Sequence, residues 1–115
     1  MNNLDTTIAK IRAFRDARDW MQFHNPKNLA ISITLEAAEL LEHFQWKSML
    51  ESEAHAKAAR AEIAEEVADV AIYLLEFADH LGIDLLSAID AKLEKNEAKY
   101  PVAKARGSSV KYTKL

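Results

Sequence analysis

Pairs of carboxylates spaced three residues apart are the side chains of this sequence with the clearest capacity for chemistry. Glu36 and Glu39 form one pair, and Glu66 and Asp69 form a second. Residues three apart on a helix project from the same face, so each pair would present two carboxylates together. The spacing alone is weak evidence, because a helical chain with 18 acids contains several such pairs, most of which are ordinary solvated faces.

The residues around these two pairs distinguish them from a solvated face. Apolar side chains cover most of the circumference of both helical segments and leave one narrow polar stripe on each. The stripes consist of Ser32, Glu36, Glu39 and His43, and of Glu62, Glu66, Asp69 and Tyr73. A helix that is apolar nearly all round is expected to be buried, so the acidic stripes are predicted to face a sheltered cleft.

Sheltered carboxylates that repel one another need protons or cations. Burying a carboxylate is costly unless it is paired or bound to a metal, and no Lys or Arg lies between Glu62 and Ile89. A cluster of carboxylate oxygens suits Mg²⁺ or Mn²⁺. A di-iron or manganese oxidase-like bundle is the nearest alternative, but it requires Glu-x-x-His on two helices, and here His43 follows Glu39 by four residues.

Four helices are predicted to position these residues. Their predicted ranges are Asp5 to Phe23, Asn28 to Phe44 or Trp46, Ser52 or Glu53 to Leu81, and Asp84 to Lys99. Pro26 and Pro101 act as stops, and Gly82 is expected to take a left-handed conformation after the third helix. Only 2 Gly and 2 Pro are present, which argues against a sandwich or barrel. We therefore predict an all-α, four-helix bundle over residues 1–101, followed by a basic tail over residues 102–115.

Composition limits the remaining classes of function. The 115 residues suit one domain, and the absence of Cys excludes disulfides and thiolate metal sites. The net charge of −3 gives no global reason to bind a nucleic acid polymer, and no apolar run is long enough for a membrane span. A soluble cytoplasmic protein is therefore expected. Two helices apolar on most sides are more than a 13.0 kDa subunit covers, which predicts a homo-oligomer.

The arrangement of acids and aromatics resembles a known family. Glu36-Ala-Ala-Glu39 followed by Glu65-Glu66-Val-Ala-Asp69 is similar to the E-x-x-E…E-x-x-D signature of the MazG-like, all-α nucleoside triphosphate pyrophosphohydrolases. Further segments resemble the dCTP pyrophosphatase branch of that family: Asp19 to Leu29, Phe44 to Lys47, Asp69 to Leu74, Lys99 to Pro101, and Ser109 to Tyr112. The resemblance extends from about residue 10 to the C-terminus of the sequence.

The resemblance implies a nucleotide pyrophosphohydrolase that cleanses the nucleotide pool. The expected reaction converts a deoxynucleoside triphosphate, dCTP or a related and possibly modified one, to the monophosphate and pyrophosphate. The expected cofactor is Mg²⁺, with Mn²⁺ as a possible substitute, held by Glu36, Glu39, Glu66 and Asp69. The expected assembly is a homotetramer built as a dimer of dimers, with sites between subunits.

Further residues receive roles in this interpretation. Glu39 is expected to accept the proton of the attacking water, with Glu36 or Glu65 as alternatives. Trp20 and Trp46 are expected to stack on the base, and Phe23 and His24 to line the same pocket. Tyr73 and Asn96 are expected to position ribose or phosphate, and Lys99, Arg106 and Lys111 to bind the distal phosphates. His43 is expected to be solvated or to lie behind the metal ligands.

Ordinary structural roles are the alternative to these functional assignments. Core packing is the ordinary role of Trp, and fraying is the ordinary state of a basic terminal segment. The whole protein would then be a non-enzymatic helical oligomerisation or interaction module, with its acids serving only in assembly. The sequence leaves the base preference and the number of metal ions open.

Overall fold

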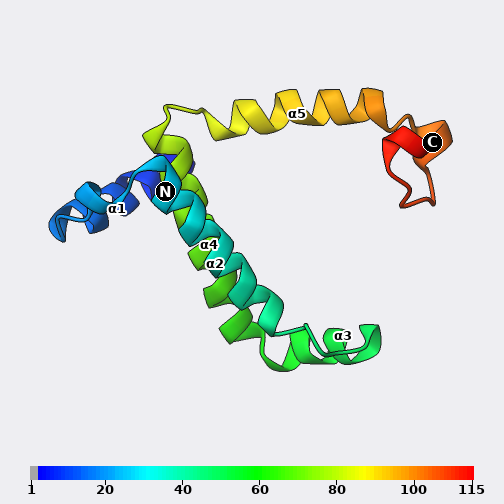
Figure 1. The fold of residues 1–115 in the computed structure, drawn as a ribbon, viewed down its shortest axis with the longest axis horizontal. Coiled ribbons are helices and arrows are strands. Elements are labelled where there is room, and N and C mark those ends of the chain that lie inside the picture. Colours follow the sequence, from blue (N-terminus) through cyan, green and yellow to red (C-terminus); the bar gives the residue numbers. More distant parts are fainter. Residues whose placement is uncertain (1–2) are drawn as a thin grey trace. The chain divides into compact units, whose positions relative to one another are not determined.

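A computed structural model describes residues 3–115, and the chain packs as two units. The first unit extends to Gly82, and the second runs from Ile83 to Leu115. All regular structure within residues 3–115 is helical and comprises six α-helices and two short 3-10 helices (Figure 1). The predicted all-α class is confirmed, whereas the structure contains six α-helices in place of the predicted four.

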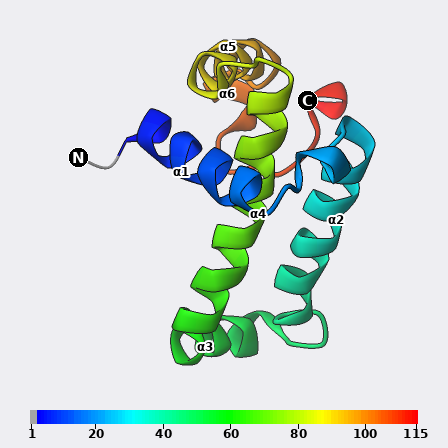
Figure 2. The same cartoon turned by 90° about the vertical axis from the view of Figure 1, so that its left-hand side faces the viewer.

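The first unit is built on α2 (Pro26–Glu42) and α4 (Arg60–His80), which pack against each other in antiparallel directions. Figure 2 shows this pair, with α1 (Leu4–Ala17) lying across α4. Helix α2 begins earlier than predicted, because Asn25 caps it by accepting a hydrogen bond from the Asn28 N–H at 2.9 Å. Pro26 is then in the first turn, where its missing N–H is not needed.

Helix α1 ends at Ala17 and does not reach Phe23, as the sequence had suggested. Asp19 adopts a left-handed conformation with φ +53°, which Asp tolerates better than most residues. The Gln22 side-chain amide donates to the Asp19 carbonyl at 2.9 Å and supports the turn. A short 3-10 helix, η1 (Met21–Phe23), then leads into α2. This turn places Trp20 and His24 beside α4.

Helix α3 (Met49–Ala58) occupies much of the polar stretch from Lys47 to His55, which the sequence predicts to be a linker between the second and third helices. A reciprocal capping box begins it: the Glu51 N–H donates to Ser48 Oγ, and the Ser48 N–H donates to Glu51 Oε1. The helix ends at Ala59, whose φ of −104° and ψ of 26° leave the helical region. The single helix predicted from Ser52 or Glu53 to Leu81 is therefore two helices.

The first unit buries few of its apolar side chains. Leu29 and Ala78 are the buried hydrophobic residues among those described, and one ion pair, between Arg12 of α1 and Asp79 of α4, ties α1 to the pair of long helices. Large apolar side chains on α2 and α4 remain exposed: Ile31, Leu35, Leu41, Val67, Ile72 and Leu74. These helices thus carry apolar surface that their own unit does not cover.

The second unit consists of α5 and the segment that follows it. Gly82 has the predicted left-handed φ of +67°, and Asp84 caps α5 (Leu85–Lys99) by accepting a hydrogen bond from the Ser87 N–H at 3.1 Å. Both features confirm the predicted start of this helix. Among the helices formed by residues 3–115, none has the length and apolarity needed to cross a membrane.

The segment after Pro101 is more structured than the expected tail. It forms α6 (Val102–Ala105) and a final 3-10 helix, η2 (Tyr112–Lys114). The Tyr112 ring packs edge-to-face against Tyr100 with centroids 5.8 Å apart, and the Lys99 ammonium lies 4.8 Å from the Tyr112 ring. The end of the chain therefore folds back onto the end of α5. The functional boundary predicted after residue 101 stays a prediction.

Candidate functional site

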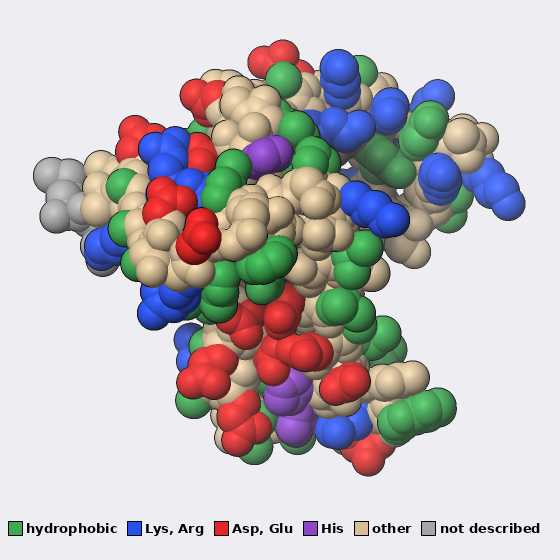
Figure 3. Space-filling view, turned by 60° about the vertical axis from the view of Figure 1, so that its left-hand side comes forward, with side chains coloured by type: hydrophobic (Ala, Val, Ile, Leu, Met, Phe, Trp, Pro, Cys, Tyr) green, Lys and Arg blue, Asp and Glu red, His purple; other side chains and the backbone are tan. Residues whose placement is uncertain are grey.

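Three carboxylates from α2 and α4 converge where the two helices pack. Oxygen atoms of Glu36, Glu39 and Glu66 all lie within 4.8 Å of one another. Asp69, one turn beyond Glu66 on α4, lies outside this group of three but acts electrostatically on both Glu36 and Glu66. Figure 3 shows acidic side chains gathered on one face, with histidine beside them. The structure therefore brings the two predicted acidic stripes together.

The environment of this acidic cluster penalises negative charge. Burial raises the pKa of Glu36 to about 7, and the hydrogen bond and charge of neighbouring Glu39 add to the effect. Burial likewise raises the pKa of Glu66, again with contributions from Glu39 and then Asp69. Protons are thus held more tightly here than by ordinary carboxylates.

Two oxygen atoms of the acidic cluster have no partner. Oε2 of Glu36 and Oε2 of Glu66 are buried without a hydrogen-bond donor among residues 3–115. Buried acceptors are normally satisfied, so an unsatisfied pair facing one cluster indicates a proton or a cation as the missing partner. Closely spaced carboxylate oxygens are the ligands that Mg²⁺ and Mn²⁺ prefer, so the donor set fits a hard divalent cation.

A second group of predicted residues lines a small cavity of about 40 Å³ further along α4. Trp20, His24 and Tyr73 contribute to its wall, together with Glu76 of α4. His24 Nδ1 lies 2.5 Å from Oε1 of Glu76, which is only 4% exposed. This contact fixes the imidazole so that Nε2 is the ring nitrogen left for another partner.

Tyr73 connects this small cavity to the acidic cluster. Its ring lies 6.4 Å from the His24 ring, measured between centroids. Burial raises the pKa of the Tyr73 hydroxyl, and the charges of Glu36 and then Glu76 raise it further. Because both acids act on one phenol, Tyr73 lies between the acidic cluster and the His24 cavity.

Trp46 is placed differently from Trp20. It follows the C-terminal end of α2 and is 88% exposed, whereas Trp20 precedes the N-terminal end of the same helix. Met49 and Leu50, just after Trp46 in the chain, are also largely exposed. The two tryptophans therefore do not stack on a common group within one chain.

The predicted phosphate-binding residues belong to the second unit. Lys99 ends α5, and its contact with the Tyr112 ring brings it close in space to the segment that contains Lys111. Arg106 follows α6, and Asn96 is half-buried on α5, where its carbonyl accepts the N–H of Tyr100 at 2.8 Å. Phe23, expected in the base pocket, is 57% exposed at the end of η1.

Two residues at these sites were not singled out from the sequence. Glu76 looked like one of several acid pairs with Asp79, although an acid between Leu75 and Phe77 is a signal of burial. His55 gave no signal, because twelve residues separate it from His43, whose ring it contacts. His43 itself is half-buried and paired, so it is not simply solvated.

Comparison with known proteins identifies relatives of this sequence. A sequence model of the MazG-like family matches residues 31–115. The chain is 44% identical over 104 residues to the dCTP pyrophosphatase 1 of Mus musculus and 42% identical over 104 residues to that of Homo sapiens. These matches cover 89% of this chain and 61% of each relative, so the chain spans about three fifths of the length of these curated relatives.

A solved structure shares the fold. The crystal structure of a pyrophosphatase from Archaeoglobus fulgidus superimposes with a TM-score of 0.84 at 45% sequence identity. The match covers 88% of this chain and 94% of the archaeal chain. The similarity therefore extends over nearly the whole of a protein of comparable length.

Proposed function

This chain belongs to the MazG-like family, and we propose that it hydrolyses a deoxynucleoside triphosphate to the monophosphate and pyrophosphate. The observation that carries the proposal is the convergence of Glu36, Glu39 and Glu66 with two partnerless buried oxygens. The relatives named dCTP pyrophosphatase 1 support dCTP, or a related or modified deoxynucleotide, as the substrate. Such an activity would cleanse the nucleotide pool.

Glu36, Glu39, Glu66 and Asp69 would hold Mg²⁺, or Mn²⁺ in its place. A divalent cation bound there would neutralise the phosphates and favour attack by water, which are the main requirements of phosphoryl transfer. Among these acids Glu39 and Asp69 are exposed, whereas Glu36 and Glu66 are half-buried, and Glu39 is the exposed acid that belongs to the group of three. An exposed carboxylate within the cluster is reached by water, so we assign Glu39 as the residue that accepts the water proton.

His24 would read the base and Tyr73 would position the sugar or a phosphate. Glu76 holds His24 Nδ1, so His24 Nε2 is the nitrogen available to a base edge. Tyr73 lies between His24 and the acidic cluster, which is where the sugar must lie if the base is at His24 and the phosphates are at the acids. Trp20 borders the same cavity and supplies a stacking face.

A base stacked between both tryptophans requires two chains. The 17-residue helix α2 separates Trp20 from Trp46 and is about 25 Å long. Rings that sandwich one base are at most about 7 Å from it. We therefore propose that Trp46 is supplied by a second copy, in the homotetramer built as a dimer of dimers. The exposed apolar side chains of α2 and α4 offer surface for that copy.

The distal phosphates need positive charge that the acidic cluster lacks. Lys99, Arg106 and Lys111 are the proposed source, with Asn96 as a polar neighbour on α5. The fold of the second unit supports this role, because the Lys99–Tyr112 contact gathers Lys99 and the Lys111 segment. Their approach to the nucleotide stays a prediction.

The test is the release of pyrophosphate from a panel of deoxynucleoside triphosphates in the presence and absence of Mg²⁺. We expect pyrophosphate without orthophosphate, and release of orthophosphate alone would reject the reaction. Glu39→Gln should abolish turnover with its helical content intact, while the matched variant Glu65→Gln should retain it. The reverse result would transfer the proton-accepting role to Glu65. If Mg²⁺ with nucleotide does not stabilise the protein against heat, the protein is an interaction module instead.

A further inference from the structure

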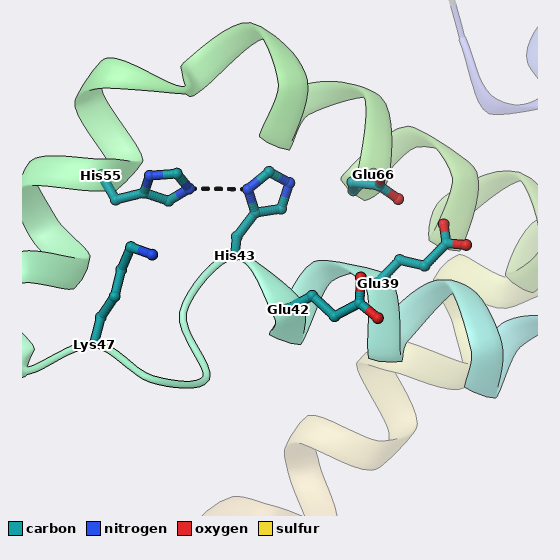
Figure 4. A pocket seen from close by; sticks show the side chains of 6 residues that line it. All are labelled: Glu39, Glu42, His43, Lys47, His55 and Glu66. Carbon is teal, nitrogen blue, oxygen red and sulfur yellow. Dashed lines mark hydrogen bonds between the residues drawn. The ribbon is translucent and has the colours of Figure 1, made fainter.

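A histidine pair lies at one end of the larger cavity of the first unit. The cavity has a volume of about 490 Å³, and its wall includes Glu39, Glu42, His43, Lys47, His55 and Glu66 (Figure 4). His43 Nδ1 and His55 Nε2 lie 2.9 Å apart, one ring at the C-terminal end of α2 and the other on α3. The reaction proposed above uses neither ring.

The spacing of these two nitrogens suits a chelated metal ion. Zinc lies about 2.0–2.1 Å from an imidazole nitrogen, so nitrogens 2.9 Å apart subtend about 90° at one ion. Opening the pair to about 3.3 Å gives the tetrahedral angle, a change of less than about half an ångström. We propose that His43 and His55 bind a divalent transition-metal ion of the zinc class, in place of the proton that they otherwise share.

The rest of the cavity supplies charge for this ion. Glu42, one residue before His43, and Glu66 on α4 line the same space, so their carboxylates add negative charge beside the ion. Lys47 is the opposing charge on the wall, but it is exposed, so its ammonium can turn toward water. Three carboxylates against one ammonium leave the cavity net negative.

The proposed ion differs in chemistry from the one expected at the acidic cluster. Imidazole nitrogen favours Zn²⁺, Ni²⁺ and Cu²⁺, whereas Mg²⁺ selects oxygen and retains its water. Glu36, a central member of the acidic cluster, is not part of the cavity wall. Excess Mg²⁺ should therefore occupy the carboxylates and leave the histidine pair free for the softer ion.

Zinc binding to the untagged protein in excess Mg²⁺ tests the proposal. We expect titration calorimetry to show one Zn²⁺ per chain, and Co²⁺ to give the visible absorption of a nitrogen-ligated ion. Loss of a residue that merely supports a metal ligand already costs about 10–100-fold in affinity, so His43→Gln and His55→Gln should each weaken Zn²⁺ binding by at least about tenfold. His80→Gln, which changes a histidine outside the cavity, and Glu36→Gln should leave it unchanged.

Three results would overturn the proposal. The first is that the protein binds no Zn²⁺ in excess Mg²⁺. The second is that the His43→Gln and His55→Gln variants bind Zn²⁺ with the affinity of the unaltered protein. The third is that Glu36→Gln loses as much Zn²⁺ affinity as the two histidine variants. The third result would place Zn²⁺ at the acidic cluster. Circular dichroism checks that each variant keeps its helices, and if one does not, the Co²⁺ spectrum of the unaltered protein decides between nitrogen ligation and oxygen ligation alone.

Discussion

In the absence of divalent cations, the protein should lose stability as the pH rises from about 5 to about 8. The reason is Glu36. Burial and the neighbouring Glu39 raise its pKa from the ordinary value of 4.5 to about 7 in the folded protein. Between these two values the folded protein holds a proton that the unfolded chain has released. The free energy of unfolding therefore falls with rising pH, by at most about 1.4 kcal/mol per pH unit, and the loss is complete by about pH 8.

The size of this effect follows from the same shift. In a site closed to water, a change from 4.5 to about 7 would correspond to roughly 3 kcal/mol. Water reaches this cluster, since the adjacent Glu39 is exposed, so screening reduces the expected effect to about 1 kcal/mol. For a chain of this length, that corresponds to a fall in Tm of about 5 °C.

Thermal melts in chelator across this pH range measure the effect. Glu36→Gln removes one of the two acids whose pKa is raised and should make the fall in Tm shallower, because Glu66 still titrates, whereas Glu53→Gln, an exposed acid on α3, should behave like the unaltered protein. Added Mg²⁺ should restore stability at about pH 8, where the carboxylates are free to bind it. A Tm that stays level or rises with pH, or a fall that is equally steep in Glu36→Gln, would refute the assignment of Glu36 as the main acid that titrates in this range.

Three further predictions concern particular side chains. Glu76→Gln removes the charge that holds His24 and should raise KM for the nucleotide roughly tenfold with little change in kcat; steady-state kinetics with unchanged KM would contradict this role. Trp46→Ala should weaken nucleotide binding by about 1–3 kcal/mol without lowering Tm, because the ring is 88% exposed; calorimetry with nucleotide and a melt measure the two quantities. Ser48→Ala breaks a capping box and should cost about 1 kcal/mol, with hydrogen exchange rising in residues 49–58 and not in α2.

The acidic cluster was predictable because two independent signals agreed. Carboxylates at helical spacing supplied the chemistry, and apolar residues around them supplied the burial, so Glu36, Glu39, Glu66 and Asp69 were expected to converge. The first three do, and Asp69 lies outside that group but acts on Glu36 and Glu66 through its charge. The start of α5 was predictable for the same reason, since Gly82 and Asp84 carry strong local preferences that the fold obeys.

The ends of two helices could not be predicted, because the local conformational preferences of their residues are too weak. The break at Ala59 lies among Ala and Arg, which favour helix, so tertiary packing overrides propensity there. The end of α1 at Ala17 depends on the left-handed backbone conformation of Asp19, which the sequence around Asp19 does not predict. The capping box of Ser48 and Glu51 is visible in the sequence and would have predicted the start of α3. It was missed because the polar stretch from Lys47 to His55 was interpreted as a linker.

Glu76 shows why spacing alone misassigns acids. Glu76 and Asp79 form a pair of the same kind as Glu66 and Asp69, yet among residues 3–115 neither Glu76 nor Asp79 belongs to the cluster of closely spaced carboxylates. Asp79 pairs with Arg12 of α1, and Glu76 contacts His24 after η1, so both acids have partners in the N-terminal segment. Within residues 3–115, the acids toward the other end of α4 form no ion pair of this kind. What separates a paired acid from a proposed metal ligand along α4 is therefore whether α1 and η1 reach it.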